Sequence, residues 1–83
     1  MSKELGAQLD VAEVILKALS RGPLRRTDLE NHVVSKGVSI SCFRHKFAWL
    51  VVDGDIVKVG VEWTAPFMVT AKGKAFLVWR DML

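Results

Sequence analysis

The sequence predicts a small α+β protein in which helices come first, a short β-hairpin follows, and a last helix ends the chain. Apolar residues recur at the spacing of one helix face up to residue 53. From Ile56 the pattern changes to β-branched residues, which favour a strand. Residues 70–83 then return to a helical pattern. With 83 residues, the chain is expected to form a single domain over 1–83.

The first expected helix covers residues 3–20 and carries two apolar stripes. One stripe is formed by Val11, Val14, Ile15, Ala18 and Leu19, and the other by Leu5, Leu9, Ala12 and Leu16. One stripe is enough for a core, so the second implies a further contact, either with the C-terminal helix or with a second subunit. Asp10 is an alternative N-cap, which would start the helix near Val11.

A second helix is expected from Thr27 to about Lys36. Before it, a glycine and a proline within residues 21–24 are expected to end the first helix, and Leu24 could seed a very short strand. Thr27 and Glu30 have the spacing of a capping box, in which each side chain bonds to the backbone amide of the other residue. Gly37 is expected to stop this helix.

The central helix lies within residues 39–55 and has two contrasting faces. Ser41 or Ser39 can cap its start, and Gly54 can take the left-handed conformation that ends it. The apolar face contains Phe43, Phe47, Leu50 and Val51, and the opposite face contains Ser41, Arg44, His45 and Ala48, with Trp49 at its edge. Two helices joined by a short, glycine-containing turn form a helix-turn-helix unit, whose second helix is offered to the major groove of DNA.

The hairpin is expected to join residues 56–59 to a return strand at 63–69, with a turn at residues 60–62. Pro66 lacks an amide donor, so the return strand should be an edge there. Thr70 is expected to cap the last helix. Apolar residues cover most of that helix, which favours a homodimer in which residues 1–10 and the helix 71–83 take part.

Composition favours a cytoplasmic or nucleoid-associated protein. Hydrophobic residues make up 51% of the chain, the net charge is +3, and there is one cysteine, as expected in a reducing compartment. No apolar run is long enough to span a membrane, and no secretory signal opens the sequence. Two runs without acidic residues, 14–27 and 31–52, lie before and across the central helix and favour a phosphate-binding face.

Four segments, VAEVILKALSRGP, RRTDLENHV, SISCFRHKFAWLVVDGDIVKV and MVTAKGKAFL, resemble successive parts of small bacterial, archaeal and viral winged helix-turn-helix regulators. The last is similar to a pattern, LT-x-KG-x-x-x-L, at the end of their hairpin. The resemblance implies a three-helix core, a two-stranded hairpin called the wing, and a C-terminal helix. It also implies binding of double-stranded DNA, commonly as a symmetric dimer, and thus transcription regulation.

The resemblance implies a DNA-binding surface and a dimer interface. DNA-binding residues would be Arg25, Arg26, Thr27, Ser39, Ser41, Arg44, His45, Lys46, Ala48 and Lys58; dimer residues would be Leu5, Leu9, Leu16, Phe76, Trp79 and Leu83. Arg44 could make a bidentate contact to guanine O6 and N7 through its guanidinium group, or could contact only a phosphate. Lys46 lies toward the core side, so it is expected to snorkel or to meet a phosphate.

The composition of the wing tip qualifies these expectations. The wing tip carries Glu62 and Trp63 where such proteins usually have arginine or lysine, and Trp63 is expected to pack or to lie at an interface. The alternative is therefore a protein-binding module that uses Trp49, Trp63 and the last helix. We expect no enzyme, since the sequence has no phosphate loop, metal-ligand cluster or nucleophile–base set; no cofactor, metal or small-molecule ligand is evident.

Overall fold

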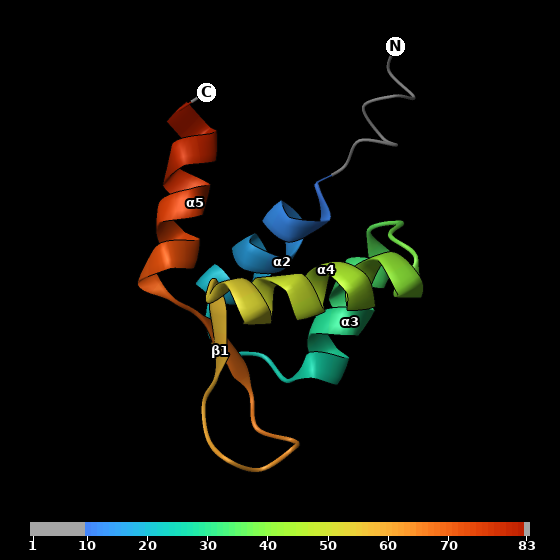
Figure 1. Cartoon of the computed structure of the whole chain (residues 1–83). Helices are drawn as coiled ribbons and strands as arrows, with labels where there is room; N and C mark the ends of the chain where they lie inside the picture. Colours follow the sequence, from blue (N-terminus) through green and yellow to red (C-terminus); the bar gives the residue numbers. More distant parts are fainter. Residues whose placement is uncertain (1–9, 83) are drawn as a thin grey trace.

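The computed structural model describes residues 10–82, which form four helices and one two-stranded antiparallel sheet (Figure 1). In chain order these are α2 (Val11–Ser20), α3 (Arg26–Ser35), α4 (Ile40–Asp53), β1 (Ile56–Lys58), β2 (Phe67–Val69) and α5 (Ala71–Met82). The predicted α+β class is confirmed. Across residues 10–82, none of the helices combines the length and the apolar character needed to cross a membrane.

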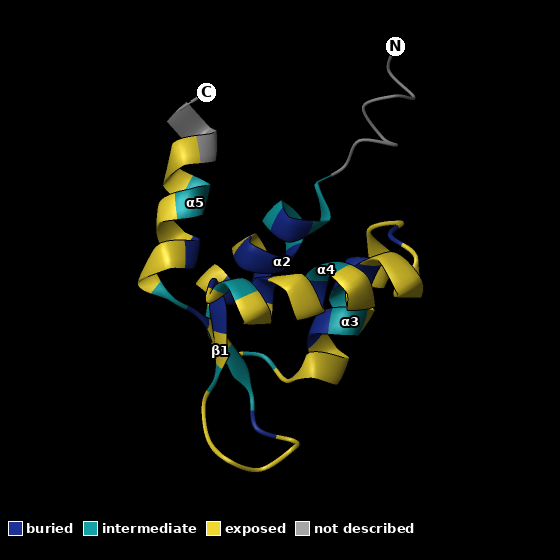
Figure 2. Ribbon diagram, viewed as in Figure 1, coloured by how far each residue is buried: buried dark blue, intermediate teal, exposed yellow. Residues whose placement is uncertain are grey.

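The core lies where α2 contacts α3, α4, α5 and β2 (Figure 2). Its fully buried side chains are Ile15, Leu16, Leu19, Leu29, Val33, Phe43, Leu50 and Ile56. Leu16 has 0% exposure, so the prediction that it faces a second subunit is wrong. Ala12 and Leu16, the part of this stripe that the structure describes, are buried within the chain, and α2 contacts α5, which agrees with the other alternative. Leu5, Leu9 and Leu83 lie outside the described residues.

Helix α4 buries Phe43, Phe47 and Leu50 as predicted, but Val51 is 39% exposed. Eight residues after Phe43, an α-helix has advanced about 80° past a whole number of turns. Val51 therefore lies at the margin of the buried face, and its assignment to the core was wrong.

Of the two N-cap candidates for α4 the structure uses Ser39 and not Ser41, and Gly54 ends the helix as predicted, whereas the predicted cap of α3 is not formed. The Ser39 hydroxyl accepts a hydrogen bond from the Cys42 amide at 3.2 Å, and Gly54 ends α4 with φ of 87°. Helix α3 starts at Arg26, and its N-cap, Arg25, makes no side-chain cap bond. The capping-box prediction for Thr27 and Glu30 is wrong, because the helix begins too early in the chain for Thr27 to be its cap.

The hairpin is shorter in its strands and longer in its loop than predicted. β1 and β2 pair in the register Ile56 with Val69 and Lys58 with Phe67. The return strand begins at Phe67 instead of residue 63, because residues 59–66 form a loop held by a hydrogen bond from the Ala65 amide to the Glu62 carbonyl at 3.0 Å. On the other edge of β2, the Phe67 amide donates to the Leu24 carbonyl at 2.7 Å, which confirms the short strand segment at Leu24.

Helix α5 is attached where α4 ends, at a contact that we call the α4–α5 junction (Asp53, Asp55, Thr70, Lys72 and Gly73). The Thr70 hydroxyl lies 2.7 Å from the Gly54 carbonyl oxygen and 3.0 Å from that of Asp55, to which it donates. The hydroxyl oxygen of Thr70 also accepts a hydrogen bond from the Gly73 amide at 3.3 Å, so Thr70 is the N-cap that the sequence predicts. Lys72 adds an ion pair to Asp53 at 3.3 Å.

Candidate nucleic-acid interface

The outer face of α4 is polar and open to solvent. Ser41, Arg44, His45 and Ala48 are all exposed on it, and Ser39 is exposed at its start. On the opposite side of the same helix, the rings of Phe43 and Phe47 stack with centroids 5.4 Å apart, and Phe47 meets Phe67 edge-on at 4.9 Å. These buried aromatic contacts fix the rotation of α4, and so they determine which side chains it offers to a partner.

A second exposed group of polar residues lies at the start of α3. Arg25, Arg26 and Thr27 are all exposed there. Arg25 makes no side-chain cap bond among the described residues, and the first amides of a helix have no acceptor within the helix itself. An uncapped helix start favours an anion such as a phosphate.

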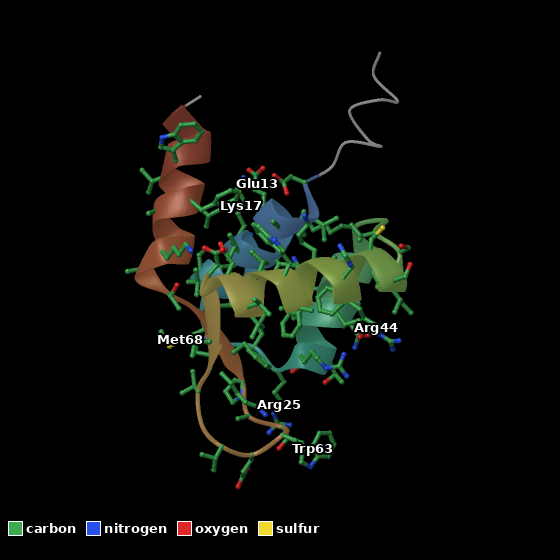
Figure 3. All side chains as sticks on the ribbon, in the orientation of Figure 1. Glu13, Lys17, Arg25, Arg44, Trp63 and Met68 are labelled. Carbon is green, nitrogen blue, oxygen red and sulfur yellow. The ribbon has the colours of Figure 1, made fainter. Side chains whose placement is uncertain are left out.

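The loop of the hairpin reaches this helix start. Trp63 and Thr64 line a small cavity of about 160 Å³ together with Arg25, Arg26 and Thr27. Figure 3 shows Arg25 and Trp63 close to each other at the end of the loop. Trp63 is 86% exposed, so the packing role considered for it is not filled within the described chain. This placement could not be read from the sequence, because it depends on how residues 59–66 fold.

The exposed cations differ in their ion pairs. Arg26 pairs with Glu30 at 3.1 Å, whereas Arg25 and Arg44 have no acidic partner within the part of the chain that the structure describes. We call Arg25, Thr27, Ser41, Arg44 and His45 the cationic face. Its two unpaired guanidinium groups are the strongest candidates for contacts with an anion.

Lys46 and Lys58 are less available than the arginines. Lys46 is half-buried, and its Nζ lies 5.1 Å from the centroid of the exposed Trp49 ring, in a cation–π contact. This contact leaves open both roles expected for Lys46, that it snorkels or meets a phosphate. Lys58 is partly buried on β1, opposite Phe67. Both side chains are therefore less open to a partner than those of Arg25 and Arg44.

The residues expected at a dimer interface differ in exposure. Trp79 is 63% exposed on α5 and Val78 is 59% exposed beside it, whereas Phe76 is partly buried against the core. Among the described residues, no three histidine, cysteine or acidic side chains gather in a way that could hold a metal ion. No protein-family model matches the chain, and neither a curated protein nor a solved structure is significantly similar to it.

Proposed function

We propose that this protein binds duplex DNA, with a winged helix-turn-helix fold, and acts as a small transcription regulator in the cytoplasm or on the nucleoid. The observation that carries the proposal is the exposure of Arg44, which has no ion pair among the described residues, on a helix whose other side is packed into the core by Phe43 and Phe47. The order of elements, with α3 and α4 followed by a hairpin and α5, is compatible with this fold.

Helix α4 would enter the major groove, as the second helix of a helix-turn-helix unit does. Arg44 would then reach a base edge, where its fork matches the two acceptors of guanine, while Ser41 and His45 offer shorter polar contacts. Ala48 leaves room for close approach or for contact with a thymine methyl group.

The start of α3 would hold the DNA backbone. A phosphate placed there would accept from first-turn amides, from the Arg25 guanidinium and from the Thr27 hydroxyl. Trp63 would lie against the neighbouring sugar, because it lines the same small cavity as Arg25. Lys58 would meet a flanking phosphate.

A homodimer would place two α4 helices on a symmetric DNA site. Trp79 and Val78 support an interface on α5, since both are large, apolar and exposed. Sedimentation velocity over a range of protein concentrations tests this part. We expect a dimer that is weakened by Trp79→Ser; a monomer at all concentrations would overturn the dimer without touching DNA binding.

A protein-binding module is the second candidate. It is favoured by the exposure of three tryptophans, 50% for Trp49, 86% for Trp63 and 63% for Trp79. Large exposed aromatic side chains often anchor protein interfaces, and such association depends little on salt. Salt dependence therefore separates the two functions.

The decisive experiment is fluorescence-anisotropy binding to random duplex DNA across a salt series. We expect wild type to bind with a steep salt slope, and each lost phosphate contact to reduce that slope by about 0.9. Arg25→Ala should lower both affinity and slope, whereas Lys74→Ala, which removes an exposed cation from α5, should change neither. Absence of binding by wild type at low salt would overturn the DNA assignment and favour the protein-binding one.

The role of Arg44 needs a further comparison. After selection of a preferred sequence, Arg44→Lys should retain most binding to random DNA, because the charge is kept. It should lose sequence preference, because lysine cannot make the bidentate contact. If Arg44→Lys keeps the full preference, Arg44 contacts only phosphate.

A further inference from the structure

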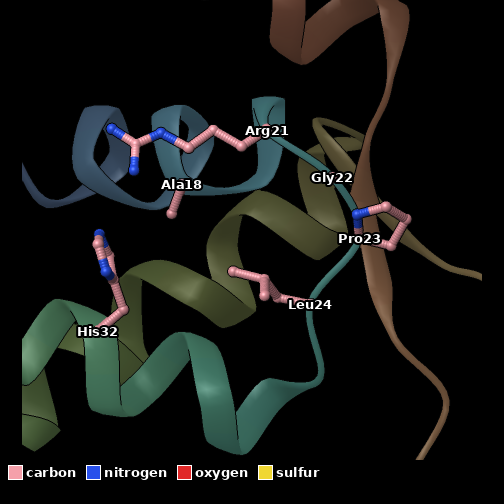
Figure 4. A pocket seen from close by; sticks show the side chains of 6 residues that line it. All are labelled: Ala18, Arg21, Gly22, Pro23, Leu24 and His32. Atoms are coloured by element: carbon pink, nitrogen blue, oxygen red, sulfur yellow. The ribbon is translucent and has the colours of Figure 1, made fainter.

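A groove lies between α2 and α3 (Figure 4). It consists of two adjoining cavities of about 330 and 270 Å³, which share Ala18, Arg21 and His32 in their linings. Volumes near 300 Å³ stand at the lower end of the range for small-molecule sites. We call this feature the α2–α3 groove; Val14, Ala18, Pro23 and Leu24 form its apolar part.

The rim of the α2–α3 groove is cationic. Lys17, Arg21 and Lys36 line it, and none of the described acidic residues does. Lys17 is paired with Glu13 at 2.9 Å. Arg21 and Lys36, in contrast, have no ion pair among residues 10–79, so their charges are available to an anion.

Helix dipoles explain part of this arrangement. Arg21 is the C-cap of α2 and Lys36 that of α3, and a cation near a helix C-terminus is favourable by itself. The helix dipoles alone do not explain why both cations line the same apolar groove. In Figure 4, however, the Arg21 side chain runs back along α2, and the His32 ring rises from α3 towards it. Ala18 and Leu24 lie beside them as the apolar lining of the same cavity.

We propose that the α2–α3 groove binds a small organic anion, in which a carboxylate or phosphate group is attached to a short apolar body. Arg21 and Lys36 would hold the charged group, with an N–H of His32 as a further donor. The apolar body would cover Val14, Ala18 and Leu24, and burial of that surface adds affinity. A nucleic-acid backbone fits less well, because it would leave the apolar lining uncovered.

Two-dimensional amide NMR of the full chain, without DNA, tests this site directly. Hexanoate and monobutyl phosphate are the probes, and they distinguish the two kinds of charged group. 1-Hexanol has the apolar body without the charge, and inorganic phosphate has the charge without the apolar body. We expect saturable shifts confined to residues 14–24 and 32–36 with hexanoate, monobutyl phosphate or both, and much weaker binding of the two control compounds to these residues.

The variants Arg21→Gln and Lys36→Gln should each weaken probe binding by about tenfold, the value of one charge-assisted hydrogen bond. Both residues are exposed, so the amide spectrum should show a retained fold. Lys74→Gln is the matched control and should bind like wild type. Equal binding of 1-hexanol, equal binding of inorganic phosphate, shifts spread over all cations, or no saturation would each overturn the proposal. None of these outcomes bears on DNA binding, which is measured separately.

Discussion

The α4–α5 junction and the cationic face differ in how far their residues are buried and bonded within the chain. At the junction, Asp55 is only 4% exposed, Gly73 is buried, and the Thr70 hydroxyl contacts two carbonyl oxygens. On the cationic face, Arg25 and Arg44 are exposed and without a described ion pair. The difference predicts that stability and the proposed DNA binding depend on separate residues. Substitutions at the junction should therefore change stability, and those on the face should change binding alone.

The largest effect is expected from Gly73→Val. A Cβ at Gly73 would overlap the Asp55 carbonyl oxygen and lie 2.6 Å from Val69 Cγ2, so the backbone of α5 would have to move. Such overpacking should lower the free energy of unfolding by about 3 kcal/mol. Urea denaturation measures this loss. The same residue introduced at the exposed position Ala75 should cost only about 0.6 kcal/mol of helix propensity; equal losses at both positions would show that the junction is not tightly packed.

A smaller loss is expected from Thr70→Val, which preserves shape but removes the hydroxyl. The Gly54 and Asp55 carbonyls lose a donor and the Gly73 amide loses its acceptor, which should cost about 1–2 kcal/mol. Thr27→Val is the matched control on the cationic face, where the threonine is exposed. It should leave unfolding within about 0.5 kcal/mol of wild type. A large loss of unfolding free energy in Thr27→Val would contradict the assignment of stability and binding to separate residues.

On the cationic face, Arg25 and Arg26 should differ although they are neighbours. Arg25→Ala should weaken DNA binding roughly tenfold, since one charge-assisted contact is lost. Removing the Arg26–Glu30 pair together, by Arg26→Ala/Glu30→Ala, leaves the net charge unchanged and should alter affinity by less than about threefold. Anisotropy titrations at fixed salt measure both. If the double variant loses as much as Arg25→Ala, Arg26 leaves Glu30 to bind phosphate.

The same contrast shows what the sequence could predict. The caps at Ser39, Gly54 and Thr70 were predictable because each depends on residues within a few positions. The buried face of α4 followed from helical spacing, except at its margin. The capping box at Thr27 failed because α3 starts just after Leu24 is drawn into a bridge with Phe67, a partner distant in sequence.

Residues of the candidate sites were harder to predict when two elements contribute to one place. Arg44 could be predicted, because its exposure follows from the position of Phe43 and Phe47 on the same helix. The approach of Trp63 to Arg25 could not, because it requires the loop to fold back to α3. In the same way, Arg21 and Lys36 meet in the α2–α3 groove only through the packing of two helices.

The smallest effect, and the only one that depends on pH, concerns Asp55. Burial raises the pKa of its carboxyl group; a hydrogen bond and the negative charge of Asp53 raise it further, and Lys72 lowers it. An acid whose pKa is higher in the folded state than in the unfolded one stabilises the fold below the unfolded pKa, and this contribution is lost as pH rises through the folded pKa. Wild type should therefore lose stability relative to Asp55→Asn between about pH 4 and neutral pH.

Urea denaturation of wild type and Asp55→Asn at both pH values tests this loss, because only the difference between the two proteins is compared. Lys72→Gln sharpens the test, since removal of the cation that lowers the pKa of Asp55 should make the loss of stability larger. A stability difference that does not change with pH would mean that Asp55 reaches solvent in the folded protein. The junction would then resemble the exposed cationic face more closely than its packing indicates.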